Sequence, residues 1–303
     1  MVTGAAPGRR AGNDGEEAGA EAPDGLAKVL RIAPDPGLFG PQSVTWRVHA
    51  DPLLGLGGLR ALLLQAVHPL AMAGVAEHSR FRSDPWGRLV RTARYVGTVT
   101  YGTTAEAKSA AARVRRLHQT VKGTDAVSGR PYRAADPELL TWVHVTEVDS
   151  FLTTARRGGL RLTDAEADTY VAEQAEANAL LGVPAELAPH SVAEIGEYYA
   201  RMRPQLQVGA YARDAAKFVI HPPMSRKIAW LTPARPLWYG LGGLAFALLP
   251  AWVRRMYRLP GLPTTDLGAT VGVRALHATL MQVPEARRDG PALTAAKQRL
   301  GLI

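Results

Sequence analysis

One histidine stands on the apolar face of a helix that the sequence predicts over residues 104–122. The predicted apolar face consists of Ala111, Val114, Leu117 and Val121. His118 follows Val114 by four residues and precedes Val121 by three, which puts its imidazole on the same face. A neutral imidazole in an interior can ligate iron, and it can equally be a core side chain whose ring nitrogens bond to a carbonyl or a carboxylate. The spacing alone leaves both interpretations open.

A second predicted helix carries an imidazole and a carboxylate together. His144 and Glu147 are three residues apart on the face that Leu140 and Phe151 also occupy, so both polar side chains project from one side. Such a pair is found as a metal ligand set, as a set of outer partners around a ligand, or as a buried hydrogen-bonded pair.

A non-haem iron site is one alternative that these residues leave open. His68 precedes Pro69, where a buried helix must break or kink, and Glu77 follows one segment later. His68, His144, Glu147 and Glu77 would be enough ligands for iron if they met in one interior. The doubled Glu-x-x-His motif of di-iron bundles is missing from the sequence.

A basic stripe lies on another predicted helix, over 88–99. Arg88, Arg91, Thr92 and Tyr95 follow the i, i+3, i+4, i+7 spacing of one helix face. Facing water, such a stripe is ordinary. Facing the interior, it requires anionic partners, because a buried guanidinium is costly unless it is paired, and haem propionates are partners of that kind.

The elements that position these residues are helical throughout from Ser43 onward. The sequence shows no sustained period-2 alternation and predicts an all-α fold of about nine to twelve helices. Capping residues and glycine or proline stops mark four of the helices, at 104–122, 136–157, 163–181 and 191–202. We predict two parts: a disordered tail over 1–25, too poor in large apolar side chains to fold, and a helical domain over 26–303.

Composition excludes several classes of protein. The 303 residues are 47% hydrophobic and contain no Cys, which excludes a disulfide scaffold, zinc ribbons and thiolate nucleophiles. The net charge is +9, but no long Lys/Arg tract or recognition motif accompanies it, so we expect no nucleic-acid partner. Arg9-Arg10 precedes polar residues rather than an apolar stretch and is not an export signal, which favours a cytoplasmic location.

One apolar segment stands apart from the rest. Residues 236–252 hold no charge over 17 residues and are followed by Arg254 and Arg255. The segment is short for a bilayer span, which needs about 20 apolar residues. Two interpretations remain: a core helix or pocket wall, or a peripheral contact with a membrane surface.

The order and spacing of several short motifs resemble one known family. They are VAEHS at 75–79, DPWGRLVRT at 84–92, VRRLHQTVKG at 114–123 and DPELLTWVHVT at 136–146. Over residues 40–260 the chain resembles the DUF2236 group, the catalytic domain family of MpaB and the rubber oxygenase (latex clearing protein).

The resemblance implies a single globin-like all-α domain that binds haem b. It places the proximal iron ligand at His118, within the Val-Arg-x-x-His-x-x-Val pattern. Where rubber oxygenases have Arg-x-x-Lys-Thr on the distal side, this chain has Arg91 in the place of lysine, and a guanidinium does not readily bind iron. By position, Glu77 is the candidate for the family's distal base.

The leading hypothesis is a haem-dependent oxygenase that uses dioxygen on an apolar small-molecule or lipid-like substrate. His118 would hold the metal, Glu77 would accept a proton, and Arg88, Arg91 and Thr92 would order the pocket or pair with propionates. The remaining cofactor contacts would come from His144 and His68. The alternatives are the non-haem iron enzyme and a non-catalytic protein that binds haem or lipid. Substrate, electron source and oligomeric state are not specified by the sequence.

Overall fold

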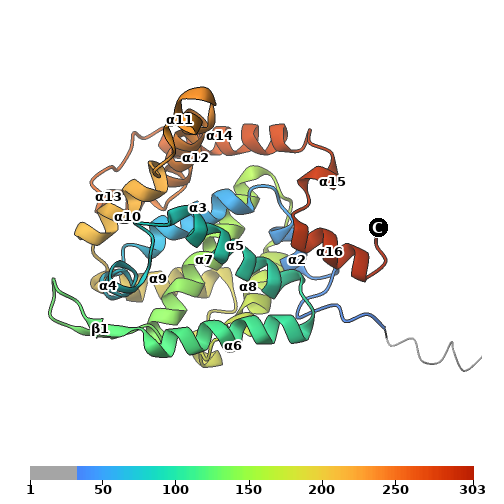
Figure 1. Cartoon of the computed structure of the whole chain (residues 1–303), viewed down its shortest axis with the longest axis horizontal. Coiled ribbons are helices and arrows are strands. Elements are labelled where there is room, and N and C mark those ends of the chain that lie inside the picture. The colour runs from blue at the N-terminus through green and yellow to red at the C-terminus, as the bar shows by residue number, and fades with distance from the viewer. Residues whose placement is uncertain (1–32) are drawn as a thin grey trace, which may run out of the picture. The chain divides into compact units, whose positions relative to one another are not determined.

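The computed structural model describes residues 33–303, of which Asp35–Ile303 form one compact unit. The unit is all-α, as predicted, and it also contains one small hairpin (Figure 1). The first helices are α2 (Val44–His49), α3 (Leu54–Gln65), α4 (Pro69–His78), α5 (Pro85–Tyr101) and α6 (Thr104–Thr120). The hairpin strands β1 (Lys122–Thr124) and β2 (Pro131–Arg133) follow. The predicted tail over 1–25 lies outside the described residues.

The second half of the unit is also helical. Its longer helices are α7 (Pro137–Gly158), α8 (Asp164–Ala179), α9 (Val192–Met202), α10 (Ala210–Ile220), α12 (Ala234–Ala247), α14 (Thr265–Leu280) and α16 (Pro291–Arg299). The short ones are α11 (Arg226–Leu231), α13 (Ala251–Met256) and α15 (Glu285–Arg288), with 3₁₀ turns η1 (Ala185–Leu187) and η2 (Arg203–Gln205).

Two sequence predictions about these elements were wrong. The described residues contain 15 α-helices rather than nine to twelve, because short helices between Pro and Gly are too brief for their periodicity to show. The hairpin was not predicted, since three-residue strands cannot show an alternating pattern. Its strands pair antiparallel, with Gly123 opposite Tyr132.

The main core lies between α3 and α7. Gly57 lets the two helices approach closely, because a Cβ there would meet Phe151 Cδ1 at 3.0 Å and the Ser150 carbonyl oxygen at 3.2 Å. Arg60 on α3 is buried, and its Nη1 lies 2.9 Å from Asp149 Oδ2 on α7. Its Nε donates to the Leu248 carbonyl oxygen at 3.0 Å, so one guanidinium ties three segments together.

The apolar segment 236–252 mostly packs into this core. Ala245, Leu248 and Leu249 are fully buried, and Leu241 and Leu244 pack against the core. The core interpretation of the segment is thus the one that the structure supports for these positions. Among the described residues no single helix is long and apolar enough to cross a bilayer, and only α3 and α4 together, bent by 107°, reach that apolarity.

Candidate functional site

His118 lies near the carboxyl end of α6. The helix begins with a capping box in which the Thr103 hydroxyl accepts from the Glu106 N–H and the Glu106 carboxylate accepts from the Thr103 N–H. The face predicted to turn inward is buried at Ala111, half-buried at Val114, His118 and Val121, and exposed at Leu117. The prediction of an apolar face was therefore wrong for Leu117, and His118 stands at the edge of the interior.

The imidazole of His118 has bonding capacity that no neighbour uses. Its Nδ1 is buried and finds no hydrogen-bond partner among residues 33–303. Burial lowers the pKa of His118, so the ring is neutral at pH 7. A neutral imidazole with an unused ring nitrogen is the form that ligates a metal.

The carboxyl-terminal part of α6 and the amino-terminal part of α5 carry several of the candidate cofactor contacts. The two helices pack against each other, and α5 is buried only at its far end, over Val99, Thr100 and Tyr101. Its first turns are half-buried or exposed. The less buried turns of α5 are thus the ones that carry Arg88, Arg91 and Thr92.

Arg88 is the recessed member of the basic stripe. Burial lowers the pKa of its guanidinium, and the positive charge of Arg91 adds to that effect. Among the described residues no carboxylate forms an ion pair with Arg88. A half-buried guanidinium without a counter-ion is available to an anionic ligand.

Arg91 and Thr92 face outward in this structure. Arg91 Nη1 lies 3.0 Å from Asp84 Oδ2, and both side chains are exposed. The Thr92 hydroxyl donates to the Arg88 carbonyl oxygen at 3.1 Å. The four-residue stripe is therefore split between a recessed side and an exposed side, because helical spacing fixes which residues share a face but not how that face is turned.

His144 and Glu147 lie on α7 in a recessed environment. Burial lowers the pKa of His144 to about 4 and raises the pKa of Glu147 to about 7. The charge of Glu147 also contributes to the raised pKa values of Tyr95 on α5 and Tyr170 on α8, after burial as the main cause. Glu147 is therefore a half-buried carboxyl near two phenols, with a pKa raised to about 7.

Behind this carboxyl is a polar chain that the sequence did not reveal. His49 Nδ1 lies 2.7 Å from Thr100 Oγ1, and His49 Nε2 lies 3.0 Å from the Tyr170 hydroxyl. Burial lowers the pKa of His49 to about 3, so its ring is neutral. Thr100 follows His49 by 51 positions and Tyr170 follows it by 121, so no local sequence motif connects the three residues.

His68 and Glu77 have structural partners. His68 caps α4, since its Nδ1 accepts from the Ala71 N–H at 3.3 Å. Glu77 is exposed and accepts a hydrogen bond from the hydroxyl of Tyr132 on β2, which also lies 3.1 Å from His78 Nε2. Both residues were predicted as iron ligands. In the structure His68 caps the start of α4, and Glu77 joins α4 to the hairpin.

The described residues do not assemble the predicted non-haem iron site. Within 33–303, no three His, Asp or Glu side chains are grouped so that they could hold a metal ion. His68 uses its ring nitrogen in the α4 cap, and Glu77 contacts the hairpin. The ligand set His68, His144, Glu147 and Glu77 is therefore not brought together.

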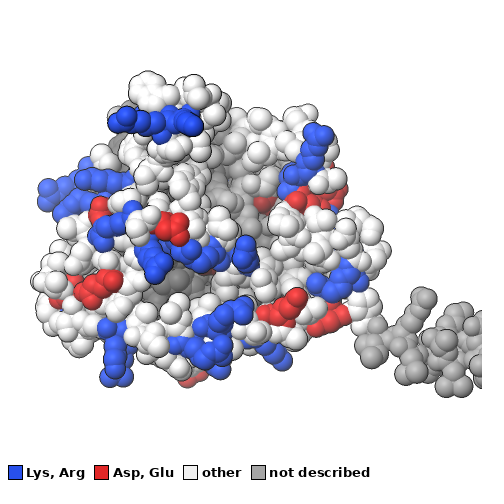
Figure 2. All heavy atoms as spheres, viewed as in Figure 1, with Lys and Arg blue, Asp and Glu red and all other residues white. Residues whose placement is uncertain are grey.

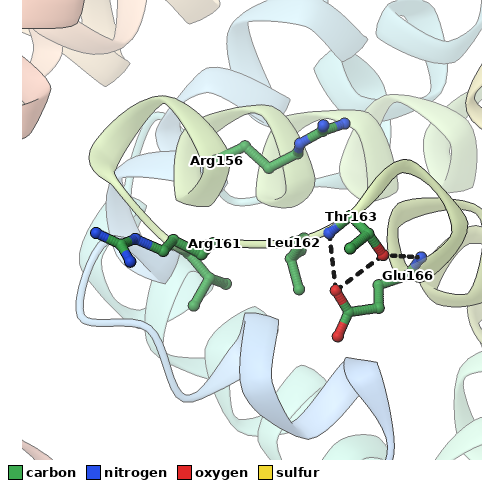
Figure 3. Close-up of a pocket in the computed structure, with 6 residues that line it drawn as sticks. Arg156, Arg161, Leu162, Thr163 and Glu166 are labelled. Atoms are coloured by element: carbon green, nitrogen blue, oxygen red, sulfur yellow. Dashed lines mark hydrogen bonds between the residues drawn. The ribbon is translucent and has the colours of Figure 1, made fainter.

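A shallow pocket of about 480 Å³ lies elsewhere, at the junction of α7 and α8. Glu166 completes the Thr163 capping box in this pocket (Figure 3). Arg156 pairs with Asp164, with 2.8 Å between Nη2 and Oδ1. Arg161 points away from Glu166 in the same view. The pocket contains none of the predicted site residues, and two of its side chains, Thr163 and Glu166, form the capping box of α8.

Comparison with protein families defines the class of this protein as an oxygenase catalytic domain. The family model described as "ER-bound oxygenase mpaB/B'/Rubber oxygenase, catalytic domain" matches residues 46–282, and the chain belongs to this family. The resemblance drawn from the motifs is confirmed. No match was found among the curated proteins or among the solved structures.

Proposed function

We propose that this chain is a haem b-dependent oxygenase that acts on an apolar small-molecule or lipid-like substrate with dioxygen. Family membership supports oxygenase activity. The observation that supports haem most directly is the neutral imidazole of His118, whose buried Nδ1 has no partner among the described residues.

Several side chains of α5, α6 and α7 fit a haem. His118 would hold the iron, as the family pattern implies. Arg88, recessed and without a counter-ion, would pair with a propionate, and Arg91 would add positive charge from the rim, where Asp84 holds it. His144 would line the cavity as a neutral ring. We give no cofactor role to His68, because its ring nitrogen caps α4.

The bound haem would supply the redox chemistry of oxygen, and the protein would supply orientation, a dry cavity and a proton acceptor. Two carboxylates are candidates for that acceptor. Glu77 is exposed and hydrogen-bonded by Tyr132, whereas Glu147 is recessed and its pKa is raised to about 7. Thr92, bonded to the Arg88 carbonyl oxygen, would support the α5 backbone at the rim.

Paired substitutions separate the two carboxylates. If Glu147 accepts the proton, the activity of the wild type rises with pH through about 7, because only the ionised carboxylate is a base. The Glu147→Gln variant then loses that dependence together with most of the activity. If Glu77→Gln has that effect and Glu147→Gln does not, the base is Glu77.

Spectra and oxygen uptake of the purified chain test the proposal. After expression with a haem precursor, we expect a Soret band in the oxidised protein that shifts on reduction. We also expect oxygen uptake with at least one member of a panel of terpenoid, polyketide and fatty-chain substrates. A Soret band without uptake would indicate a non-catalytic haem-binding protein. Iron without a porphyrin spectrum would contradict the proposal.

A further inference from the structure

The helix α11 and the first turn of α12 expose large apolar side chains to solvent. Trp230 is 79% exposed and Leu231 is 80% exposed, while Ile228 and Leu237 are exposed beside them. We call these four residues the α11–α12 patch. Adjacent exposed Trp and Leu are unusual on a surface that faces only water, and such patches mark interaction sites.

The charges around the patch are all of one sign. Arg226, Lys227 and Arg235 are exposed, and none forms an ion pair with a carboxylate among the described residues. Arg235 instead donates to the Tyr239 hydroxyl and lies over that ring. At the top of Figure 2, where Figure 1 places α11, basic side chains border uncoloured ones without an acidic residue between them.

The sequence shows how far this bias extends. Between Asp214 and Asp266 the chain has seven Lys or Arg residues and no Asp or Glu. The two flanking acids are themselves engaged, Asp214 with Arg82 at 2.7 Å and Asp266 with Arg254 at 3.0 Å. The positive charges of Arg226, Lys227 and Arg235, which flank the patch, are therefore not compensated by a neighbouring carboxylate in this part of the sequence.

The patch rests on a fixed support. Trp238, one residue after Leu237, packs edge-on against Trp86 at the start of α5, with 4.6 Å between the ring centroids. Its indole N–H donates to the Val219 carbonyl oxygen at 2.9 Å, and that of Trp86 donates to the Pro223 carbonyl oxygen at 2.9 Å. These contacts attach α12 to the body of the unit and leave the patch on its outer side.

We propose that the α11–α12 patch docks peripherally on an anionic lipid surface. Exposed Trp, Leu and Ile enter the headgroup region, and the flanking basic side chains attract anionic lipids. A second copy of the chain fits less well, because a two-fold contact through this patch would bring its like charges together. The proposed contact spans 226–237 and shares only Pro236 and Leu237 with the predicted segment 236–252, most of which packs into the core.

Vesicle co-sedimentation of the full chain tests this proposal without reference to haem or turnover. We expect binding to phosphatidylcholine vesicles that contain phosphatidylglycerol, weakening with salt, and little binding to phosphatidylcholine alone. Each basic residue near an anionic surface contributes roughly fivefold to partitioning. Arg226→Gln/Lys227→Gln should therefore weaken binding by roughly 25-fold.

Two pairs of variants separate the patch from general effects of charge and apolarity. Trp230→Ser/Leu231→Ser should abolish binding while circular dichroism stays unchanged. Arg113→Gln/Arg116→Gln on α6 removes the same charge from exposed side chains elsewhere, and Val127→Ser in the hairpin loop removes an apolar side chain that is 72% exposed. Both controls should bind like the wild type.

Three results would overturn the proposal. The first is equal binding to vesicles with and without phosphatidylglycerol, or no binding to either. The second is patch variants that bind like the controls. The third is a wild-type dimer that Trp230→Ser/Leu231→Ser converts to a monomer in light scattering, which would assign the patch to a second copy.

Discussion

His144 and Glu147 lie one helical turn apart on α7, and burial moves their pKa values in opposite directions, to about 4 for the histidine and about 7 for the carboxyl. Both residues are therefore held in their neutral forms over a shared range of pH. The pair combines a recessed acid that titrates near neutrality with a neutral imidazole. Its position on the face of Phe151 follows from the sequence, but its protonation depends on the packing around it.

Opposite pKa shifts should give opposite dependences of stability on pH. The folded state binds the Glu147 proton more tightly than the unfolded state, so this group loses stability as pH rises from 4.5 to about 7. The folded state binds the His144 proton more weakly, so that group loses stability as pH falls from 6.5 to about 4. In the wild type the two slopes largely cancel.

Single substitutions should reveal each slope in urea unfolding at pH 5, 6 and 7. We expect Glu147→Gln to gain stability with rising pH over 5 to 6.5, by roughly 1 kcal/mol per pH unit, while His144→Gln loses a similar amount. Identical pH slopes in the two variants would show that neither group is shifted as described.

The two arginines on α5 should differ in their effect on haem affinity. Arg88→Gln removes a recessed cation without a protein counter-ion, and we expect an affinity roughly 10- to 100-fold lower, the usual worth of a charge-assisted bond. Arg91→Gln removes an exposed cation already paired with Asp84 and should change the affinity little. Haem titration followed by absorbance measures both, and equal losses would contradict the assignment of Arg88.

The buried ion pair of the core should be sensitive to the loss of one partner. Arg60→Ala leaves Asp149 half-buried and removes the contacts to Ser150 and Leu248, so we expect a loss of about 3–5 kcal/mol in the free energy of unfolding. Arg47→Ala breaks an exposed pair with Glu166 and should cost little. Urea unfolding of both variants checks the contrast, and similar losses would count against it.

The close approach of α3 and α7 predicts a contrast between two glycines of one helix. Gly57→Ala places a methyl group 3.0 Å from the Phe151 ring and should destabilise the protein by about 1–3 kcal/mol. Gly55→Ala meets nothing within 4 Å and should be neutral or slightly stabilising. Thermal unfolding of the two variants distinguishes them, and a stable Gly57→Ala protein would show that the interface can yield.

Much of the helical fold was predictable from local signals. Asp136, Thr163 and Ser191 were predicted to start helices, and each accepts a backbone hydrogen bond at the start of α7, α8 or α9. Capping is local chemistry, so a single sequence contains it. The hairpin escaped prediction because its pairing depends on a register between residues that are not neighbours.

The candidate site was predictable only in part. Periodicity placed His118 and the His144–Glu147 pair toward an interior, and all three are recessed. It also grouped Arg88 with Arg91 and Thr92, but in the structure Arg88 is half-buried and the other two are exposed. Periodicity could not predict this difference, because tertiary packing sets how a helix is rotated about its axis. The His49–Tyr170 contact joins α2 to α8, and no spacing rule could find it.

The central claim is that His118 binds the iron of a haem, and its most direct test is the absorption spectrum of His118→Ala. His190→Ala, which removes an exposed imidazole, is the matched control. We predict that His118→Ala, expressed with a haem precursor, loses the Soret band or shifts it to that of a haem without its axial histidine, and that added imidazole restores it. His190→Ala should keep the wild-type spectrum. A folded His118→Ala protein with the wild-type spectrum and haem content would contradict the claim.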